Sequence, residues 1–215
     1  MKTFVKLCGL RTPETVRMAP DGGAAGFVIQ VPSSPRDLSI EDAGSLVEHV
    51  PQDAEAWAVV VDPSAELVHK LFDEVGVDRI QVYGTIPPDL EFLEIHHLVP
   101  SLPVPPPGSG GEAPKIPPAE DYPRLHLDAA GQPLPGGSGV RPDWEMCARI
   151  VDSQPGRKLV LAGGLTPENV QEALAIVRPW GVDVSSGIES APGEKDPERI
   201  KAFLAAVLEF ESPHA

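Results

Sequence analysis

The sequence predicts an α/β fold, a (β/α)8 or TIM barrel, from three observations. Short apolar runs alternate with amphipathic segments along the 215 residues, and glycine-containing turns follow the last two of those runs. The hydrophobic content of 41% is enough for one sizeable core. Such alternation is typical of parallel strands joined by helical crossovers. We therefore expect a single barrel domain over residues 1–215, near the low end of barrel length.

Each element follows from its local pattern. Apolar runs predict strands near 4–8, 25–31, 56–61, 79–82, 97–101, 125–127, 159–162 and 182–185. Helical periodicity predicts helices near 13–18, 40–49, 65–75, 88–93, 142–151, 167–177 and 197–210. The fifth connection differs, because residues 103–123 are dense in proline and glycine and cannot sustain a helix. An irregular loop outside the barrel is expected there instead of the fifth helix.

Composition narrows the function and the partners. The net charge of −15 argues against nucleic acid, because phosphate repulsion would oppose binding. Cys8 and Cys147 lie far apart without metal-ligand spacing, so neither a disulfide framework nor a zinc site is expected. No apolar run approaches the roughly 20 residues of a membrane span, and no secretion signal is evident. We expect a cytoplasmic protein with no membrane partner, and the sequence leaves the oligomeric state open.

Two turns near the C-terminus predict a phosphate-binding site. Gly163 and Gly164 follow one predicted strand, and Thr166 with Pro167 is typical of the start of a helix. A Ser-Ser-Gly turn at 185–187 follows the next strand. Free amides at the start of a helix bind phosphate without a lysine. One such turn is explained equally well by chain geometry, but the pair is typical of phosphate-binding barrels.

The first and sixth predicted strands end in Cys8 and Asp128, at the rim where barrels place their chemistry. Alternation puts Lys6 on the face of Cys8, where an ammonium would lower the thiol pKa and favour the thiolate. Cys8 is equally explained as a small buried hydrophobe, and Asp128 as a cap for the following loop. For His126, on the face of Asp128, a core histidine bonded to a carbonyl is the simpler interpretation. A base and an acid facing a phosphate pocket would suit proton transfer on a phosphorylated sugar.

Segments along nearly the whole chain resemble one known family. They are KLCGLR at 6–11, GFV at 26–28, SPR at 34–36, IQV at 80–82, LD at 127–128, GGSG at 136–139, DW at 143–144, LAGGLTPENV at 161–170, VDVSSGIE at 182–189 and PGEKD at 192–196. In order and spacing they resemble the phosphoribosylanthranilate isomerases of tryptophan biosynthesis, an aromatic amino acid pathway.

The resemblance implies an isomerase that needs neither a metal nor an organic cofactor. The reaction would be the Amadori rearrangement of N-(5-phosphoribosyl)anthranilate, a small phosphorylated substrate, to 1-(2-carboxyphenylamino)-1-deoxyribulose 5-phosphate. Asp128 would protonate the ring oxygen, Cys8 would remove the C2 proton as a thiolate, and Arg36 would bind the substrate carboxylate. The loop at 129–139 would close over the site. The phosphate would be held by Gly163, Gly164, Ser185, Ser186 and Gly187, with Lys6, Gln81, Tyr83 and Asp183 as candidate supporting residues.

Three departures from the family pattern keep alternatives open. Tyr83 stands where the family usually has histidine, the predicted fifth strand lacks the common inward lysine, and an extra residue precedes Ser34. A related histidine-pathway isomerase is the first alternative, although its acid–base pair is normally two aspartates. A non-catalytic phosphosugar-binding barrel is the second.

Overall fold

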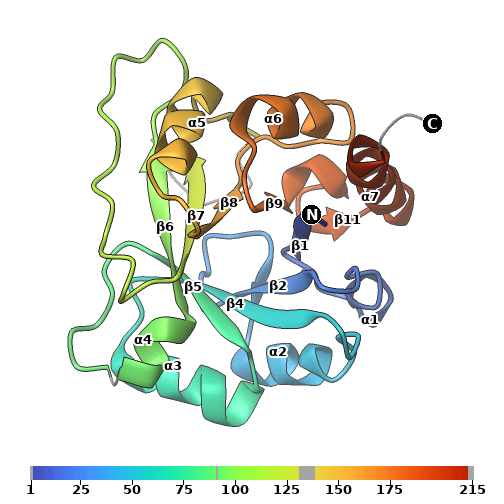
Figure 1. The fold of residues 1–215 in the computed structure, drawn as a ribbon. Coiled ribbons are helices and arrows are strands. Elements are labelled where there is room, and N and C mark those ends of the chain that lie inside the picture. The colour runs from blue at the N-terminus through green and yellow to red at the C-terminus, as the bar shows by residue number, and fades with distance from the viewer. Residues whose placement is uncertain (1, 91, 131–138, 213–215) are drawn as a thin grey trace.

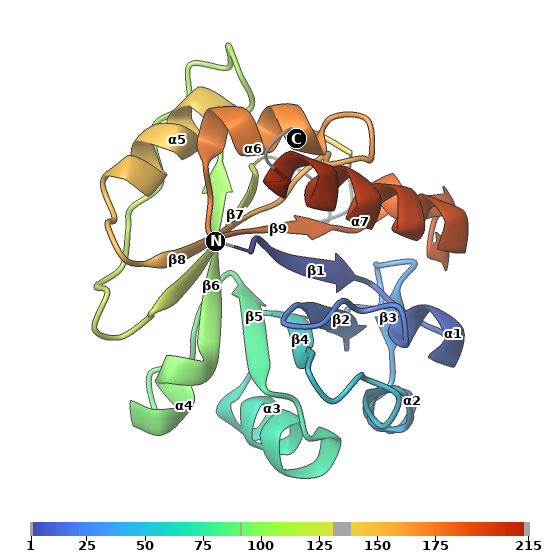
Figure 2. The same ribbon diagram turned by 45° about the vertical axis from the view of Figure 1, so that its right-hand side comes forward.

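A computed structural model describes residues 2–90, 92–130 and 139–212 of the chain. Nine parallel strands form its main sheet, of which β3 (Asp37–Leu38) is a short addition beside β2, so eight strands make the barrel. Because β1 pairs with both β2 and β9, the sheet closes on itself (Figures 1 and 2). The eight are β1 (Phe4–Cys8), β2 (Ala24–Ile29), β4 (Glu55–Val61), β5 (Arg79–Tyr83), β6 (Leu98–Val104), β7 (Arg124–Ala129), β8 (Lys158–Leu161) and β9 (Gly181–Val184).

Helices cover the outside of this barrel (Figure 2). They are α1 (Pro13–Val16), α2 (Ile40–Val47), α3 (Ala65–Lys70) continued by the π-helix η1 (Leu71–Val75), α4 (Phe92–His97), α5 (Trp144–Asp152), α6 (Val170–Val177) and α7 (Pro197–Glu211). Ser39, Ser64, Asp143 and Asp196 cap four of them by accepting amide hydrogen bonds. After β9 come the 3-10 helix η2 (Ser186–Ile188) and a hairpin of β10 (Glu189–Ala191) with β11 (Glu194–Lys195). The predicted (β/α)8 barrel is confirmed.

The fifth connection, from residue 105 to 123, contains no helix and runs as a long loop outside the barrel (Figure 1), as predicted. Arg157 fixes this loop to the start of β8. Its guanidinium donates to the backbone oxygens of Tyr122 at 2.8 Å, Pro117 at 2.8 Å and Pro118 at 3.1 Å. The loop therefore bridges β6 and β7 as an anchored segment.

Two predicted boundaries are wrong for local reasons. The helix expected at 88–93 begins at Phe92, and β6 follows it directly and extends through Pro100 and Pro103 to Val104. The helix expected from Pro167 begins at Val170. Its start is delayed because the Asn169 side chain accepts the Thr166 N–H at 2.8 Å and donates to the Gly164 oxygen at 2.9 Å. Residues 167–169 consequently form a turn.

Strand alternation sorts the barrel interior into layers. The lowest layer, which we call the barrel floor, is apolar and consists of Phe4, Ala24, Trp57, Val99 and Val160. Lys6 lies above it, with its ammonium 5.7 Å from the Trp57 ring centre. Cys8, Val28 and Val59 belong to the top layer. The interior is thus closed below and polar in the middle, and its accessible end is the C-terminal rim.

Within the described residues, no helix has both the length and the apolar character needed to cross a membrane. The single-domain organisation over 1–215 stays a prediction.

Candidate active site

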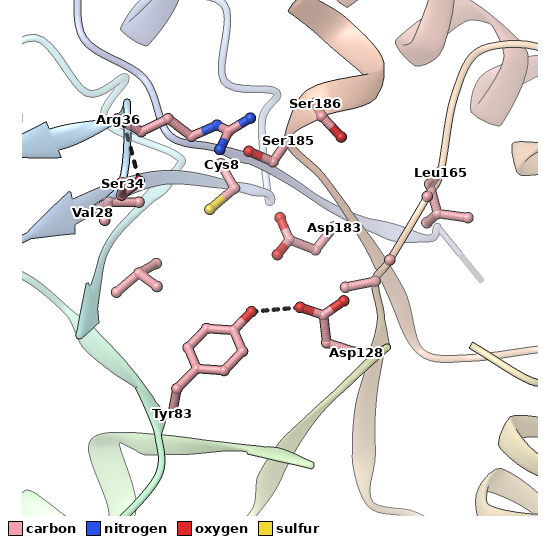
Figure 3. Close-up of a pocket in the computed structure, with 14 residues that line it drawn as sticks. Cys8, Val28, Ser34, Arg36, Tyr83, Asp128, Leu165, Asp183, Ser185 and Ser186 are labelled. Carbon is pink, nitrogen blue, oxygen red and sulfur yellow. Dashed lines mark hydrogen bonds between the residues drawn. The ribbon is translucent and has the colours of Figure 1, made fainter. Parts of the chain in front are cut away.

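A pocket opens at the C-terminal rim of the barrel and collects residues from six strands and from the segments that follow β2, β8 and β9 (Figure 3). The Cys8 thiol and the Asp128 carboxylate point toward the same space, with Asp183 and Tyr83 beside it. The lining residues are Cys8, Val28, Ser34, Arg36, Val59, Tyr83, Asp128, Ala162, Gly163, Gly164, Leu165, Asp183, Ser185 and Ser186. The structure therefore brings the predicted acid and base into one cavity.

Cys8 and Lys6 lie close together because the adjacent strand carries a glycine. A Cβ on Gly26 would lie 2.9 Å from Lys6 Cε and 3.2 Å from the Cys8 sulfur, so any other residue would push them apart. Burial raises the pKa of the Cys8 thiol above its ordinary value, and the Lys6 ammonium lowers it by less. The expected net lowering is therefore wrong, although Lys6 acts in the predicted direction.

Asp128 is held by its neighbour and by Tyr83. The Tyr83 hydroxyl donates to Asp128 Oδ2 at 2.7 Å, and the Ala129 N–H donates to Oδ1 at 2.8 Å. Burial, and then the charge of Asp128, raise the pKa of Tyr83 well above its ordinary value. The phenol at this position is therefore a donor to Asp128 that does not titrate near neutral pH.

A buried polar network lies beneath the pocket. Asp183 Oδ2 accepts from the Lys6 ammonium at 2.8 Å and from His126 Nε2 at 2.8 Å. His126 Nδ1 lies 2.6 Å from the Ser101 hydroxyl and 3.2 Å from the Gln81 amide nitrogen. Because a carboxylate only accepts, Nε2 of His126 is the donor in its contact with Asp183. His126 is thus bonded to a carboxylate, whereas the sequence favoured a backbone carbonyl.

This network leaves one carboxylate oxygen unused. Burial raises the pKa of Asp183, but the Lys6 charge and the His126 hydrogen bond outweigh it, so the pKa lies below its ordinary value. Oδ1 of this ionised carboxylate is buried and makes no hydrogen bond within the described part of the chain. Asp183 is also one of the residues that line the pocket.

Arg36 reaches the pocket from the loop between β2 and β3. The loop turns through Gln30, whose φ is +54°, and returns so that Asp37 accepts the Val31 N–H at 2.6 Å. Gly9 lies under the arginine side chain, where a Cβ would meet Arg36 Cδ at 2.5 Å. The guanidinium donates to both carboxylate oxygens of Glu189, from Nε at 2.7 Å and from Nη2 at 2.6 Å. The extra residue before Ser34 therefore does not divert Arg36 from the site.

The two predicted phosphate turns lie side by side. Gly163 and Gly164 have φ of +83° and +62°, the left-handed region that favours glycine. A Cβ on Gly187 would overlap the Leu165 oxygen, so glycine lets the second turn pack on the first. No hydrogen bond between described residues uses the backbone N–H of Gly163, Gly164, Ser185 or Ser186. These residues border the pocket, and their N–H groups are free to donate to an anion.

Sequence reasoning identified most of this pocket and overlooked part of it. Gly187 belongs to the second turn but is not among the lining residues; it packs against the Leu165 oxygen of the first turn. Residues 131–138 of the expected closing loop lie outside the described residues. Glu189 and Lys195 lie in motifs of the family resemblance to which no role was assigned, and nothing in their spacing indicated that Glu189 binds Arg36 and Lys195 binds Glu189. Among the described residues, no group of three or more His, Cys, Asp or Glu side chains is arranged to hold a metal ion.

A closed parallel barrel with an acid and a thiol at its C-terminal rim, next to two turns with free amides, has the architecture of the (β/α)8 enzymes. The sequence profile described as N-(5'phosphoribosyl)anthranilate (PRA) isomerase matches residues 5–206. The chain belongs to this family, so the resemblance noted in the sequence is confirmed.

Individual relatives agree in sequence and fold. The N-(5'-phosphoribosyl)anthranilate isomerase of Chelativorans sp. (strain BNC1) is 38% identical over 214 residues, covering 96% of each chain. The phosphoribosyl anthranilate isomerase structure from Thermus thermophilus has a TM-score of 0.78 and 30% identity, covering 97% of this chain and 100% of that one. A second phosphoribosyl anthranilate isomerase structure, in complex with reduced 1-(o-carboxyphenylamino)-1-deoxyribulose 5-phosphate, has a TM-score of 0.70 and 26% identity. The match covers 96% of this chain and 99% of that one.

Proposed function

We propose that this chain isomerises N-(5'-phosphoribosyl)anthranilate to 1-(2-carboxyphenylamino)-1-deoxyribulose 5-phosphate in tryptophan biosynthesis. The observation that carries the proposal is one pocket in which Cys8 and Asp128 face the same space. The free amides of the turns at Gly163 and Ser185 offer a phosphate site, and Arg36 offers a second anion site for the carboxylate. The known chemistry of the family needs an acid–base pair, a phosphate site and a carboxylate site around one substrate.

Asp128 and Cys8 each carry out one proton transfer of the reaction. Asp128 protonates the furanose ring oxygen, and the nitrogen lone pair opens the ring to a Schiff base. The Cys8 thiolate then removes the proton from C2 to leave an enolamine. The enolamine becomes the aminoketone as its C2 hydroxyl loses a proton and C1 gains one. No atom enters or leaves, so substrate and product are isomers. Each positioned acid or base contributes about a hundred- to ten-thousand-fold.

Supporting roles follow from the contacts around these two groups. Tyr83 holds the Asp128 carboxyl toward the pocket through its 2.7 Å hydrogen bond. The unused Oδ1 of Asp183 is suited to accept from a ribose hydroxyl, since burial would otherwise leave it unpaired. Lys6 opposes the effect of burial on Cys8 and thereby keeps more of the thiol ionised.

Steady-state turnover of two point variants tests the mechanism. Cys8→Ser and Asp128→Asn should each lower kcat by at least about a hundredfold. Binding of the reduced product analogue, measured by calorimetry, should change little, because the anion sites remain. Cys147→Ser replaces a buried thiol outside the pocket, and Asp152→Asn replaces a carboxylate with 64% exposure, so both serve as matched controls. Retained turnover in either active-site variant would remove the assigned roles.

The choice of substrate is tested separately. Wild-type enzyme should turn over N-(5'-phosphoribosyl)anthranilate and leave the histidine-pathway ribonucleotide unchanged. Turnover of only the latter would establish the sister reaction, and turnover of neither would leave a binding protein.

We further propose that turnover needs no metal or organic cofactor, because side chains supply both proton transfers. Activity should survive dialysis against a chelator, and loss of activity that added metal restores would contradict this. The cytoplasmic location stays a prediction.

A further inference from the structure

A buried ion triad lies beside the pocket and is not used by the proton transfers. Glu189 has a side chain only 5% exposed and binds Arg36 in a bidentate manner. Its Oε1 also accepts from the Lys195 ammonium at 2.6 Å, and the Lys195 side chain is 2% exposed. Burying these charges is costly unless their geometry is fixed, so the triad indicates a constraint on position.

Glu189 uses one edge of the Arg36 guanidinium and leaves the other free. A guanidinium carries five N–H donors in a planar fork, and Glu189 takes those of Nε and one of Nη2. No hydrogen bond between described residues uses Nη1 of Arg36. Figure 3 shows the end of Arg36 beside Cys8 and Ser185, at the pocket. The remaining Nη1/Nη2 edge can therefore bind a ligand carboxylate in a bidentate manner.

Lys195 connects the Arg36–Glu189 pair, which we call the arginine clamp, to the turn that begins at Ser185. Besides Glu189, its ammonium donates to the Ser185 backbone oxygen at 3.0 Å and to the Ser185 hydroxyl at 3.3 Å. One buried cation thus contacts both the residue that orients Arg36 and the residue that begins the second anion-binding turn. The positions of the two anion sites are linked through two side chains.

The β10–β11 hairpin holds both residues and rests on the Arg36 loop. Glu189 and Lys195 face each other in its register. At the hairpin turn, Gly193 has a φ of +83°, and a Cβ there would lie 2.4 Å from the Pro35 oxygen. Pro35 immediately precedes Arg36. The tip of the hairpin therefore contacts the loop that carries Arg36, and Glu189 at the base of the hairpin binds the Arg36 side chain.

We propose that Glu189 and Lys195 are positioning residues that set the distance and orientation between the Arg36 carboxylate site and the Ser185 phosphate turn. The pair selects ligands that carry a carboxylate and a phosphate at this spacing. The triad has a net charge of +1, which remains available to an anionic substrate. This inference rests on the proposed function, because it takes Arg36 as the carboxylate site.

Steady-state kinetics of Glu189 variants test the inference. Glu189→Gln keeps the side-chain shape but weakens both charge-assisted bonds to Arg36. KM for N-(5'-phosphoribosyl)anthranilate should rise on the order of 10- to 100-fold, while kcat changes less. Glu189→Asp keeps the negative charge but moves the carboxylate away from Arg36, because the side chain is one methylene shorter. Its KM should rise to a similar extent if the position of the carboxylate matters. Glu194→Gln, an exposed carboxylate on the same hairpin, is the matched control and should behave as wild type.

Binding of simple anions separates the two linked sites. Glu189→Gln should weaken binding of free anthranilate and leave binding of inorganic phosphate nearly unchanged. Lys195→Met should weaken both, because Lys195 contacts Glu189 and Ser185. These equilibrium measurements need no turnover, so they can fail while the isomerase activity stands, and they can succeed if the activity is absent.

Two results would overturn the inference. Wild-type KM and anthranilate affinity in both Glu189 variants would show that the clamp is not needed. Tighter anthranilate binding in Glu189→Gln would show that Glu189 competes with the ligand for Arg36. If Glu189→Gln fails to fold, Gly193→Ala takes its place, since pressing the hairpin tip against Pro35 should raise KM in the same direction. An unchanged KM in folded Gly193→Ala would then count against the proposal.

Discussion

Replacing Lys6 by methionine removes a fully buried ammonium and nearly preserves side-chain length. The Lys6 nitrogen lies 2.8 Å from Asp183 Oδ2. At an effective dielectric constant of about 20, two unit charges at that distance attract by about 6 kcal/mol. Desolvation offsets part of this, and removing one partner of a buried pair typically costs about 3–5 kcal/mol. In a domain of this size the melting temperature should fall by roughly 6–20 °C.

Urea unfolding of wild type and Lys6→Met gives the stability difference directly, and the slope of the transition should be the same. The double variant Lys6→Met/Asp183→Asn should recover much of the loss, because it removes the uncompensated carboxylate charge. A second readout is the reactivity of Cys8 toward an alkylating reagent in a Cys147→Ala background. Since Lys6 lowers the pKa of Cys8, alkylation of Lys6→Met should require higher pH.

Coincident unfolding curves for wild type and Lys6→Met would refute the view that this ammonium compensates Asp183. Coincident alkylation profiles would refute its action on the thiol. The two measurements are independent, so each interaction can fail alone.

Three further predictions use the same enzyme. Tyr83→Phe should lower kcat/KM by about 10-fold through loss of the hydrogen bond that orients Asp128, with an unchanged circular dichroism spectrum. Wild-type kcat/KM would exclude a role for the phenol. Because burial raises the pKa of Cys8, kcat/KM should increase as pH rises above neutrality, and a flat profile between pH 7 and about 9 would count against a thiolate base. The lowered pKa of Asp183 contributes stability that is present above the unfolded pKa of about 3.9 and is lost as pH falls through the folded pKa. The urea midpoint of Asp183→Asn should therefore drop less steeply in acid than that of wild type. Parallel curves of midpoint against pH would contradict this.

Features set by local sequence were predictable. The barrel strands follow from apolar runs, and the fifth connection lacks a helix because its prolines cannot donate backbone hydrogen bonds. Gly163 and Gly164 marked the phosphate turn because their backbone needs positive φ. Cys8 and Asp128 could be assigned to one rim because parallel strands end together.

Features set by contacts between distant residues were not predictable. Glu189 binds Arg36 across 153 positions of sequence, and no local pattern encodes that contact. The net pKa shift of Cys8 depends on how completely barrel closure removes water, which the position of Lys6 alone does not give. The start of α6 was misplaced because one asparagine side chain, Asn169, satisfies a backbone amide that the pattern assigned to the helix.

Closure of β1 against β9 has a consequence for biosynthesis of the chain. Lys6 emerges from the ribosome early, and its partner Asp183 follows 177 residues later. Until β9 is made, the Lys6 ammonium of the nascent chain lacks its Asp183 partner, and the edge of β1 that pairs with β9 is open. The Cys8 thiol then lacks the strand that encloses it on that side. Catalytic competence therefore arrives in a single late event, and a translation product that stops short of β9 should have no activity.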